Sequence, residues 1–167
     1  MTYRITGLHP SIVLPYRGLD DLALRTFGAC RIIADNTPGY PCRITLEDAQ
    51  PGEPLILFHH LSHDVSTPFR NSFAIFAREH ADRAAEWHDA IPPVMQIRTL
   101  GLKGYDAQGM MIDARLSSAG EADSSIRVLF ANPAIAYIHA HNAAPGCFAA
   151  AILRDEPAIR PISSPSS

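Results

Sequence analysis

The chain has 167 residues, 47% of them apolar and 19% charged, which is the composition of a folded globular protein and excludes a disordered one. The net charge is −3 and the Lys and Arg residues are scattered, so no nucleic-acid partner is expected. The longest apolar stretch, residues 147–153, is far shorter than the roughly 20 residues that cross a bilayer, so no membrane partner is expected.

These properties predict a single α+β domain over residues 1–156, followed by a Pro/Ser-rich tail over 157–167. The amino-terminal residues lack the basic start and apolar core of a signal peptide. Three cysteines do not suggest a secreted disulfide framework. We therefore expect a small soluble cytoplasmic protein with reduced thiols.

Up to residue 90, the sequence predicts two helices and four strands. The first helix covers residues 19–27, because Leu19, Leu22 and Phe27 fall on one face and Gly28 follows as a C-terminal cap. A weaker helix covers residues 83–90 and ends before Pro92, since a residue that precedes proline is disfavoured in the α region. The strands are expected at residues 31–34, 43–46, 55–59 and 73–77.

Beyond residue 90, we expect strands at 94–102, 110–116, 136–141 and 148–153, with a helix over 122–130 that Asn132-Pro133 ends. Asp106 and Gly109 suit a type I turn, so the first two strands should form a hairpin over residues 94–116. The predicted fold is α+β, with a largely antiparallel sheet of about six to eight short strands and two or three helices packed on it.

Two Pro-Gly turns each precede a cysteine, and they define the candidate site. Pro38-Gly39 precedes Cys42, and Pro145-Gly146 precedes Cys147; both pairs suit a type II turn. His139 and His141 lie two apart on a predicted strand, so both side chains leave the same face, close to the second turn.

Three kinds of chemistry fit these residues. Zinc could bind His139, His141 and Cys147, with Cys42 as a further ligand. Cys147 or Cys42 could instead be the nucleophile of a hydrolase or transferase, with His141 or His139 as its base and Asn142 as an orienting group. The remaining possibility is binding without bond breaking, through the polar side chains at strand ends and turns: Arg43, Arg70, His139, His141 and Asn142.

We prefer the last of these, a small polar or anionic ligand held in a His/Asn/Cys/Arg pocket, and we expect no metal. An interaction module remains a further alternative, in which an exposed strand edge pairs with another chain or with a second copy. The sequence does not fix the oligomeric state. A separate group, His59, His60 and His63, is interpreted as a polar strand exit, because adjacent residues of a strand point to opposite faces.

Three stretches together resemble a known bacterial family. They are 38–43 (Pro-Gly-Tyr-Pro-Cys-Arg), 67–72 (Thr-Pro-Phe-Arg-Asn-Ser) and 139–148 (His-Ala-His-Asn-Ala-Ala-Pro-Gly-Cys-Phe). The chain resembles the domain of unknown function 1203 from about residue 3 to residue 154. The resemblance implies a small cytoplasmic bacterial protein and no particular activity.

Overall fold

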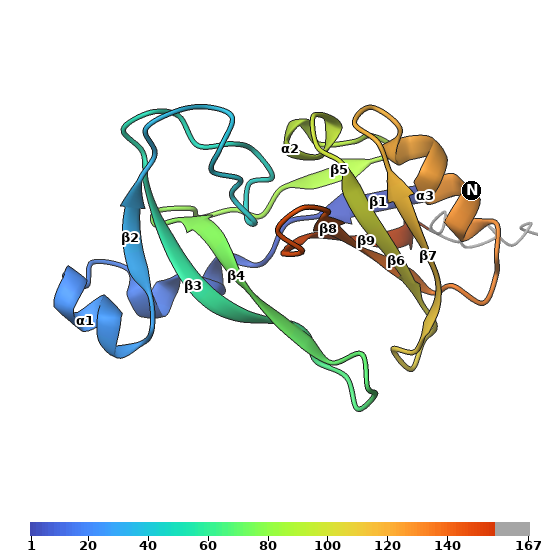
Figure 1. Ribbon diagram of the computed structural model, residues 1–167, viewed down its shortest axis with the longest axis horizontal. Coiled ribbons are helices and arrows are strands. Elements are labelled where there is room, and N and C mark those ends of the chain that lie inside the picture. Colours follow the sequence, from blue (N-terminus) through green and yellow to red (C-terminus); the bar gives the residue numbers. More distant parts are fainter. Residues whose placement is uncertain (156–167) are drawn as a thin grey trace, which may run out of the picture.

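The computed structural model describes residues 1–155, which form nine strands and three α-helices, and the expected α+β class is confirmed (Figure 1). The strands make two sheets, and every strand pair within them is antiparallel. The predicted tail, residues 157–167, lies outside the described residues. No helix within residues 1–155 has the length and hydrophobicity of a membrane-crossing segment.

The larger sheet, sheet A, has six strands in the order β5-β1-β9-β8-β6-β7. Their bounds are β1 Thr2–Thr6, β5 Glu86–His88, β6 Leu100–Tyr105, β7 Met111–Ser117, β8 Tyr137–Asn142 and β9 Phe148–Asp155. Helix α3 (Ala122–Phe130) covers one face, where Ile126 and Leu129 pack with Leu102 and Ile138 in the main core. The periodicity that predicted this helix therefore identified its buried face correctly.

The smaller sheet, sheet B, has the order β2-β3-β4, with bounds Cys30–Ile33, Pro54–His63 and Asn71–Arg78. Two 3-10 turns (Pro10–Ile12 and Leu14–Tyr16) and helix α1 (Asp21–Thr26) lie beside it (Figure 1). Helix α1 lies within the predicted range of 19–27 but is shorter, and its buried face was predicted wrongly. Leu24 is fully buried, whereas Leu22 and Phe27 are exposed, because a helix of fewer than two turns buries only the residue that faces the core.

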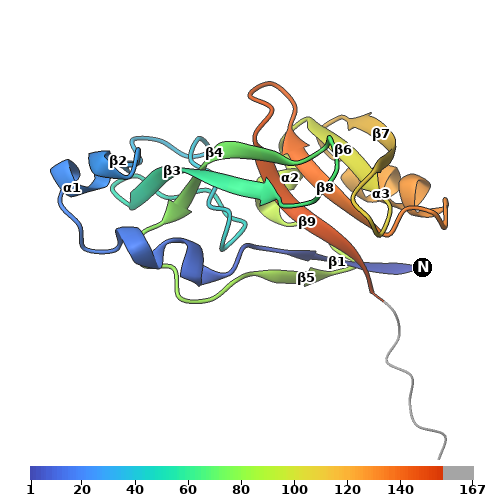
Figure 2. The same cartoon turned by 90° about the horizontal axis from the view of Figure 1, so that it is seen from below.

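The two sheets lie side by side, and the β8–β9 hairpin approaches β4 (Figures 1 and 2). The turn between β6 and β7 forms as predicted: the Gly109 amide donates to the Asp106 carbonyl, and Gly109 has a φ of +87°. At the same end of the molecule, Thr67 in the β3–β4 turn donates a hydrogen bond to the Gly109 carbonyl. The sheets are therefore connected at their hairpin tips.

One predicted strand, residues 43–46, is a turn instead. Its backbone groups bond to three different segments: Arg43 N–H to Phe76, the Arg43 carbonyl to Leu8 and the Ile44 carbonyl to Ala85. Leu46 adopts a φ of +53°. Ile44 and Leu46 are both buried, but each belongs to a different core cluster, so their apolar character does not indicate a strand.

Two further predictions near residue 90 were wrong. Residues 86–88 of the predicted helix form the short strand β5, because Trp87 pairs with Ile5 of β1 and packs against the core. Helix α2 (Pro93–Gln96) occupies the start of the strand and hairpin expected from residue 94. Pro93 stands in the first helical turn, a position that proline favours, so the proline pair that was interpreted as a helix stop is a helix start.

Candidate functional site

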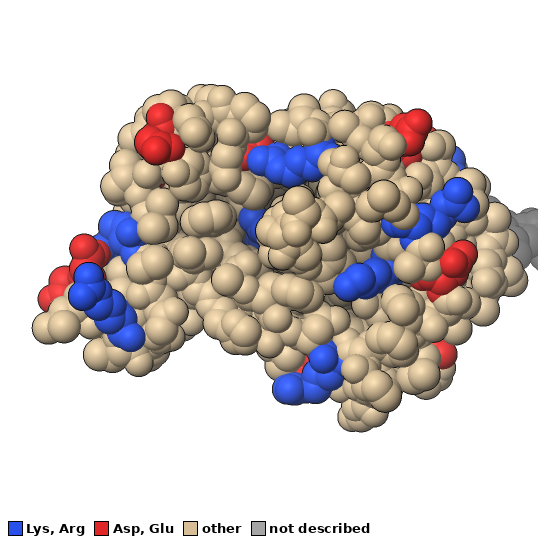
Figure 3. All heavy atoms as spheres, viewed as in Figure 1, with Lys and Arg blue, Asp and Glu red and all other residues tan. Residues whose placement is uncertain are grey.

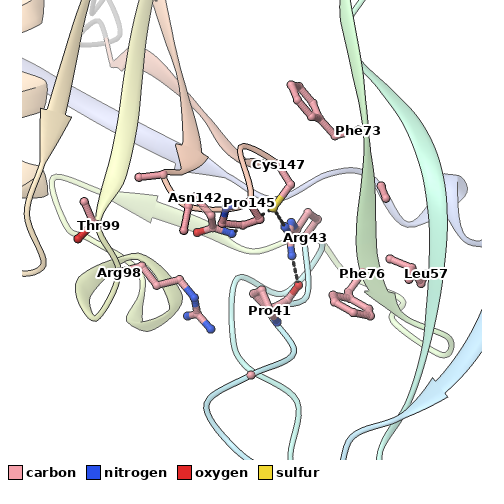
Figure 4. A pocket seen from close by; sticks show the side chains of 14 residues that line it. Pro41, Arg43, Leu57, Phe73, Phe76, Arg98, Thr99, Asn142, Pro145 and Cys147 are labelled. Carbon is pink, nitrogen blue, oxygen red and sulfur yellow. Dashed lines mark hydrogen bonds between the residues drawn. The ribbon is translucent and has the colours of Figure 1, made fainter.

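The principal cavity lies between the two sheets and has a volume of about 650 Å³. We call it the Arg43 pocket. Loop residues 39–43 form one side, β3 and β4 supply Leu57, Phe73 and Phe76, and residues 98–99 and the β8–β9 turn close the other side (Figure 4). In the space-filling view, the surface is hollowed between the sheets, with Lys or Arg atoms inside the hollow (Figure 3).

Arg43 is the central charged residue of this pocket, and only 2% of its surface is exposed. Its Nε donates to the Phe148 carbonyl, Nη1 to the Pro41 carbonyl and Nη2 to the Cys147 sulfur, at 3.0 Å for the sulfur. Burial lowers the pKa of the guanidinium, and the nearby Cys147 and Cys42 raise it. Arginine nevertheless stays protonated in proteins. No carboxylate within residues 1–155 forms an ion pair with this charge.

The β8–β9 turn places Asn142 and Cys147 at the pocket. Gly146 has the positive φ, +74°, that the predicted type II turn needs, but its N–H donates to the Asn142 carbonyl four residues earlier, so the hydrogen bond closes a five-residue turn over 142–146. The Asn142 amide nitrogen lies 3.5 Å from the Cys147 sulfur, which it contacts together with Arg43. Cys147 is partly exposed, so a ligand in the pocket could reach its thiol.

A second arginine, Arg98, also lines the pocket, but its charge is compensated. Both of its terminal nitrogens bond to the Asp48 carboxylate, at 2.8 and 2.6 Å. Burial raises the pKa of Asp48, but the hydrogen bonds from Arg98 and from the Gly39 N–H outweigh this and hold it below its usual value. This pair fixes the 39–48 loop against the segment that leads into β6. Arg43 therefore differs from Arg98, because its guanidinium has no carboxylate partner among the described residues.

His139 and His141 share one face of β8, as predicted, but they lie beside the pocket in an aromatic cluster. His139 packs against His63, Tyr105 and Phe148, while His141 Nδ1 is 3.1 Å from the Gly146 carbonyl. Burial lowers the pKa of His139 to about 3 and that of His141 to about 4, with smaller contributions from neighbouring His63 and Lys103. Both imidazoles are therefore neutral near pH 7.

The histidines do not form a catalytic pair or a metal site with the cysteines in this structure. His141 uses Nδ1 on the turn carbonyl, and Cys147 is contacted by Arg43 and Asn142 instead. No three His, Cys, Asp or Glu side chains within residues 1–155 are grouped as ligands for a metal ion. The zinc alternative therefore gains no support from the described residues.

The remaining predicted site residues lie apart from the pocket or do not reach into it. Cys42 is fully buried, and its sulfur accepts the Arg78 backbone N–H at 3.3 Å. Arg70 is in the β3–β4 turn, paired with Asp64. The turn at Pro38-Gly39 is not of type II, because Gly39 has no positive φ.

Sequence reasoning missed three contributors to this region: Arg98, the aromatic wall of Phe73 and Phe76, and His63. The predicted strand over 55–59 ended before His63, but β3 extends to this residue, whose Nε2 lies 2.7 Å from the Tyr137 hydroxyl. His59 is exposed and bonds to Ser72 on the other side of the strand, so the His59/His60/His63 group is divided as expected. No local motif marks Arg98, whose position depends on a partner 50 residues away.

The family model described as "Protein of unknown function (DUF1203)" matches residues 39–154. The match includes every segment that lines the Arg43 pocket. It begins at residue 39, whereas the resemblance to this family was expected to begin at about residue 3. No curated protein and no solved structure matches the chain.

Proposed function

We propose that this chain, which belongs to the DUF1203 family of proteins of unknown function, binds a small organic anion in the Arg43 pocket. The observation that carries the proposal is a buried guanidinium at a cavity of about 650 Å³, with no carboxylate partner among residues 1–155. Cavities of roughly 300–1,000 Å³ are typical of small-molecule sites. A buried charge is costly unless it is paired, so an anionic ligand would supply the missing partner.

The donors that remain free support recognition of an anion. A guanidinium has five N–H bonds, and the chain accepts three of those of Arg43, one from each nitrogen. One N–H on each terminal nitrogen has no acceptor among residues 1–155, and carboxylate and phosphate oxygens accept such guanidinium N–H groups. The Asn142 amide and the Thr99 hydroxyl line the same pocket and offer further donors.

The opposite wall indicates that the ligand has an apolar part. Leu57, Phe73 and Phe76 come from sheet B, and Pro41 and Pro145 come from the flanking turns (Figure 4). An aromatic or branched aliphatic body would contact these side chains while its acidic group reached Arg43. The proposed ligand class is therefore a carboxylate or phosphate ester with a compact apolar body.

Matched probes test the requirement for charge. By isothermal titration calorimetry, benzoate and phenyl phosphate are expected to bind, whereas benzamide, which has the shape of benzoate without its charge, is expected not to bind. Replacing Arg43 with methionine should weaken benzoate binding at least about tenfold, since hydrogen bonds to charged groups contribute roughly 1.5–3 kcal/mol.

Two further variants separate binding from folding. Arg70→Met removes an exposed arginine in the β3–β4 turn and should leave benzoate affinity unchanged. Phe76→Ala keeps Arg43 and should weaken the binding of benzoate far more than the binding of acetate. This variant tests the pocket even if Arg43→Met does not fold, and circular dichroism shows whether Arg43→Met is folded. Equal binding of benzamide and benzoate, or an unchanged affinity in Phe76→Ala, would contradict the proposal.

Thiol chemistry at Cys147 is a second candidate, favoured by the contact of its sulfur with Arg43 and Asn142. Both contacts orient the sulfur, and both can stabilise negative charge that develops on it during a reaction. In this form of the enzyme alternative, Cys147 is the nucleophile, Arg43 and Asn142 stabilise its sulfur, and His141 does not act as its base.

Alkylation rates test this candidate. Cys147 should react with iodoacetamide faster than Cys30, although Cys30 is the more exposed thiol, and buried Cys42 should react only on unfolding. Peptide mapping after timed labelling gives the three rates separately. Asn142→Ala should slow Cys147 and leave Cys30 unchanged. A Cys147 rate below that of Cys30 in the unaltered protein would rule the candidate out.

A further inference from the structure

Strand β7 forms an open edge of sheet A with an unusual surface. Among residues 1–155 it has β6 as its one neighbour in the sheet, and six of its seven residues are exposed (Figure 1). The exposed residues include Met111, Ile112 and Leu116, the last with 74% of its surface accessible. Edge strands with free backbone groups and apolar side chains readily pair with another strand unless charge or a bulge prevents it.

The hydrogen-bond pattern shows which backbone groups of β7 are free. Ala143 N–H donates to the Thr99 carbonyl, so the backbone groups of Thr99 point toward β8. Because these groups alternate along an antiparallel strand, those of Gly101, Lys103 and Tyr105 also point toward β8. Leu100, Leu102 and Gly104 consequently face β7, where they pair with Ser117, Arg115 and Asp113.

Ala114 and Leu116 therefore direct their backbone groups to the open edge. The Ala114 N–H agrees with this assignment, because it bonds to the side chain of its own neighbour, Asp113, at 2.8 Å. In the chain alone, the Asp113 carboxylate therefore accepts the Ala114 N–H that the carbonyl of a second strand could accept instead.

The charges of β7 are complementary to themselves. Asp113 and Arg115 are exposed, carry opposite charges, and form no ion pair with any other residue of the described chain. Antiparallel pairing of two copies about Ala114 would place each Asp113 opposite Arg115 of the second copy. That position is a non-hydrogen-bonded pair, where facing side chains are closest.

We propose that two copies of this chain pair through β7, in antiparallel register centred on Ala114, and so form one continuous sheet from both copies of sheet A. Ala114 exchanges two backbone hydrogen bonds with Ala114 of the second copy, and Asp113 releases the Ala114 N–H and turns to Arg115 of the second copy. Ile112 lies opposite Leu116 of the second copy on one face, and the two Asp113–Arg115 pairs form on the other. The partner is a second copy, because both the charges and the apolar residues match in this register.

Charge exchange tests the register by sedimentation velocity. The unaltered protein should sediment as a dimer of twice the chain mass. Arg115→Asp should raise the dimer dissociation constant at least about tenfold, because it replaces two attractive pairs with two repulsive ones. Asp113→Arg should do the same. The combined variant, Asp113→Arg with Arg115→Asp, should restore the dimer, which a merely destabilised fold would not do.

A matched control and a covalent test complete the experiment. Arg83→Asp makes the same charge change at an exposed residue away from β7 and should leave the dimer intact. Ala114→Cys should form an intermolecular disulfide on mild oxidation, because the Cα atoms of a hydrogen-bonded pair lie about 5.5 Å apart. A protein that stays monomeric at every concentration, or a dimer unaffected by either charge reversal, overturns the proposal.

Discussion

Replacing Gly7 with alanine is expected to lower the free energy of unfolding by about 3 kcal/mol, at the upper end of the usual range for overpacking. A Cβ atom at this position would lie 2.0 Å from the Ile44 carbonyl oxygen and 3.2 Å from the Arg43 carbonyl oxygen. Both neighbours are backbone, so no side-chain rotation removes the clash. The chain must move instead, although residues on both sides of the contact are hydrogen-bonded to each other.

This substitution should also impair the pocket, because the residue that must move is next to Arg43. Gly101→Ala is the matched control: a Cβ there meets no atom within 4 Å, and it should change stability by less than about 0.5 kcal/mol. Urea unfolding of both variants measures the difference, and benzoate titration of the folded Gly7→Ala protein measures the effect on the site. Equal stability of the two variants would mean that the 7–8 and 43–44 segments are not in contact as described.

Stability is expected to fall steeply between pH 6.5 and pH 4 because His139 and His141 are buried as neutral imidazoles. Their pKa values in the folded protein are about 3 and about 4, against 6.5 for an ordinary histidine. Between these values the unfolded chain binds protons that the folded chain does not bind. The stabilisation is therefore complete above about pH 6.5 and is lost as the pH falls toward the folded pKa.

The loss at pH 4 is about 3 kcal/mol for each histidine, on the basis of 1.36 kcal/mol for each pKa unit. Below pH 4 the folded protein also takes up protons, so this contribution levels off. The His139→Phe/His141→Phe double variant should flatten the dependence of unfolding free energy on pH over this window.

The exposed His80 supplies the comparison for this measurement. His80→Gln removes an exposed histidine outside the aromatic cluster and should keep the steep pH dependence that the two buried imidazoles cause. Urea titrations at half-unit pH intervals give the slopes. If the double variant kept the slope of the unaltered protein, the two imidazoles would have to be accessible to protons in the folded state.

The sequence predicted those parts of the fold that depend on neighbouring residues. The β6–β7 turn needs only the Asp106 acceptor and a glycine that tolerates positive φ, and helix α3 needs only apolar residues at helical spacing. Residues 43–46 and 86–88 failed, because their conformation depends on partners elsewhere in the chain, such as Leu8 and β1. Local propensity carries no information about such partners.

The candidate site divides in the same way. The hairpin around Gly146 was predicted, and Arg43, Asn142 and Cys147 meet at one pocket. The histidines were expected to line the same pocket as the cysteine, yet His139 packs against Tyr105 and His63, and His141 packs against Phe73 and Phe148. Which strand faces a histidine depends on sheet order, and sheet order cannot be obtained from spacing along one strand.

The position of β9 has a consequence for how the protein folds during synthesis. This strand lies between β1 and β8, and its register joins Thr2 to Asp155. Until residue 155 has left the ribosome, β1 can pair only with the three residues of β5, and the centre of sheet A is missing. Contacts of such long sequence separation are slow to form. A chain shortened by the length of β9 should therefore leave β1 and β8 without their shared neighbour and remain dependent on chaperones.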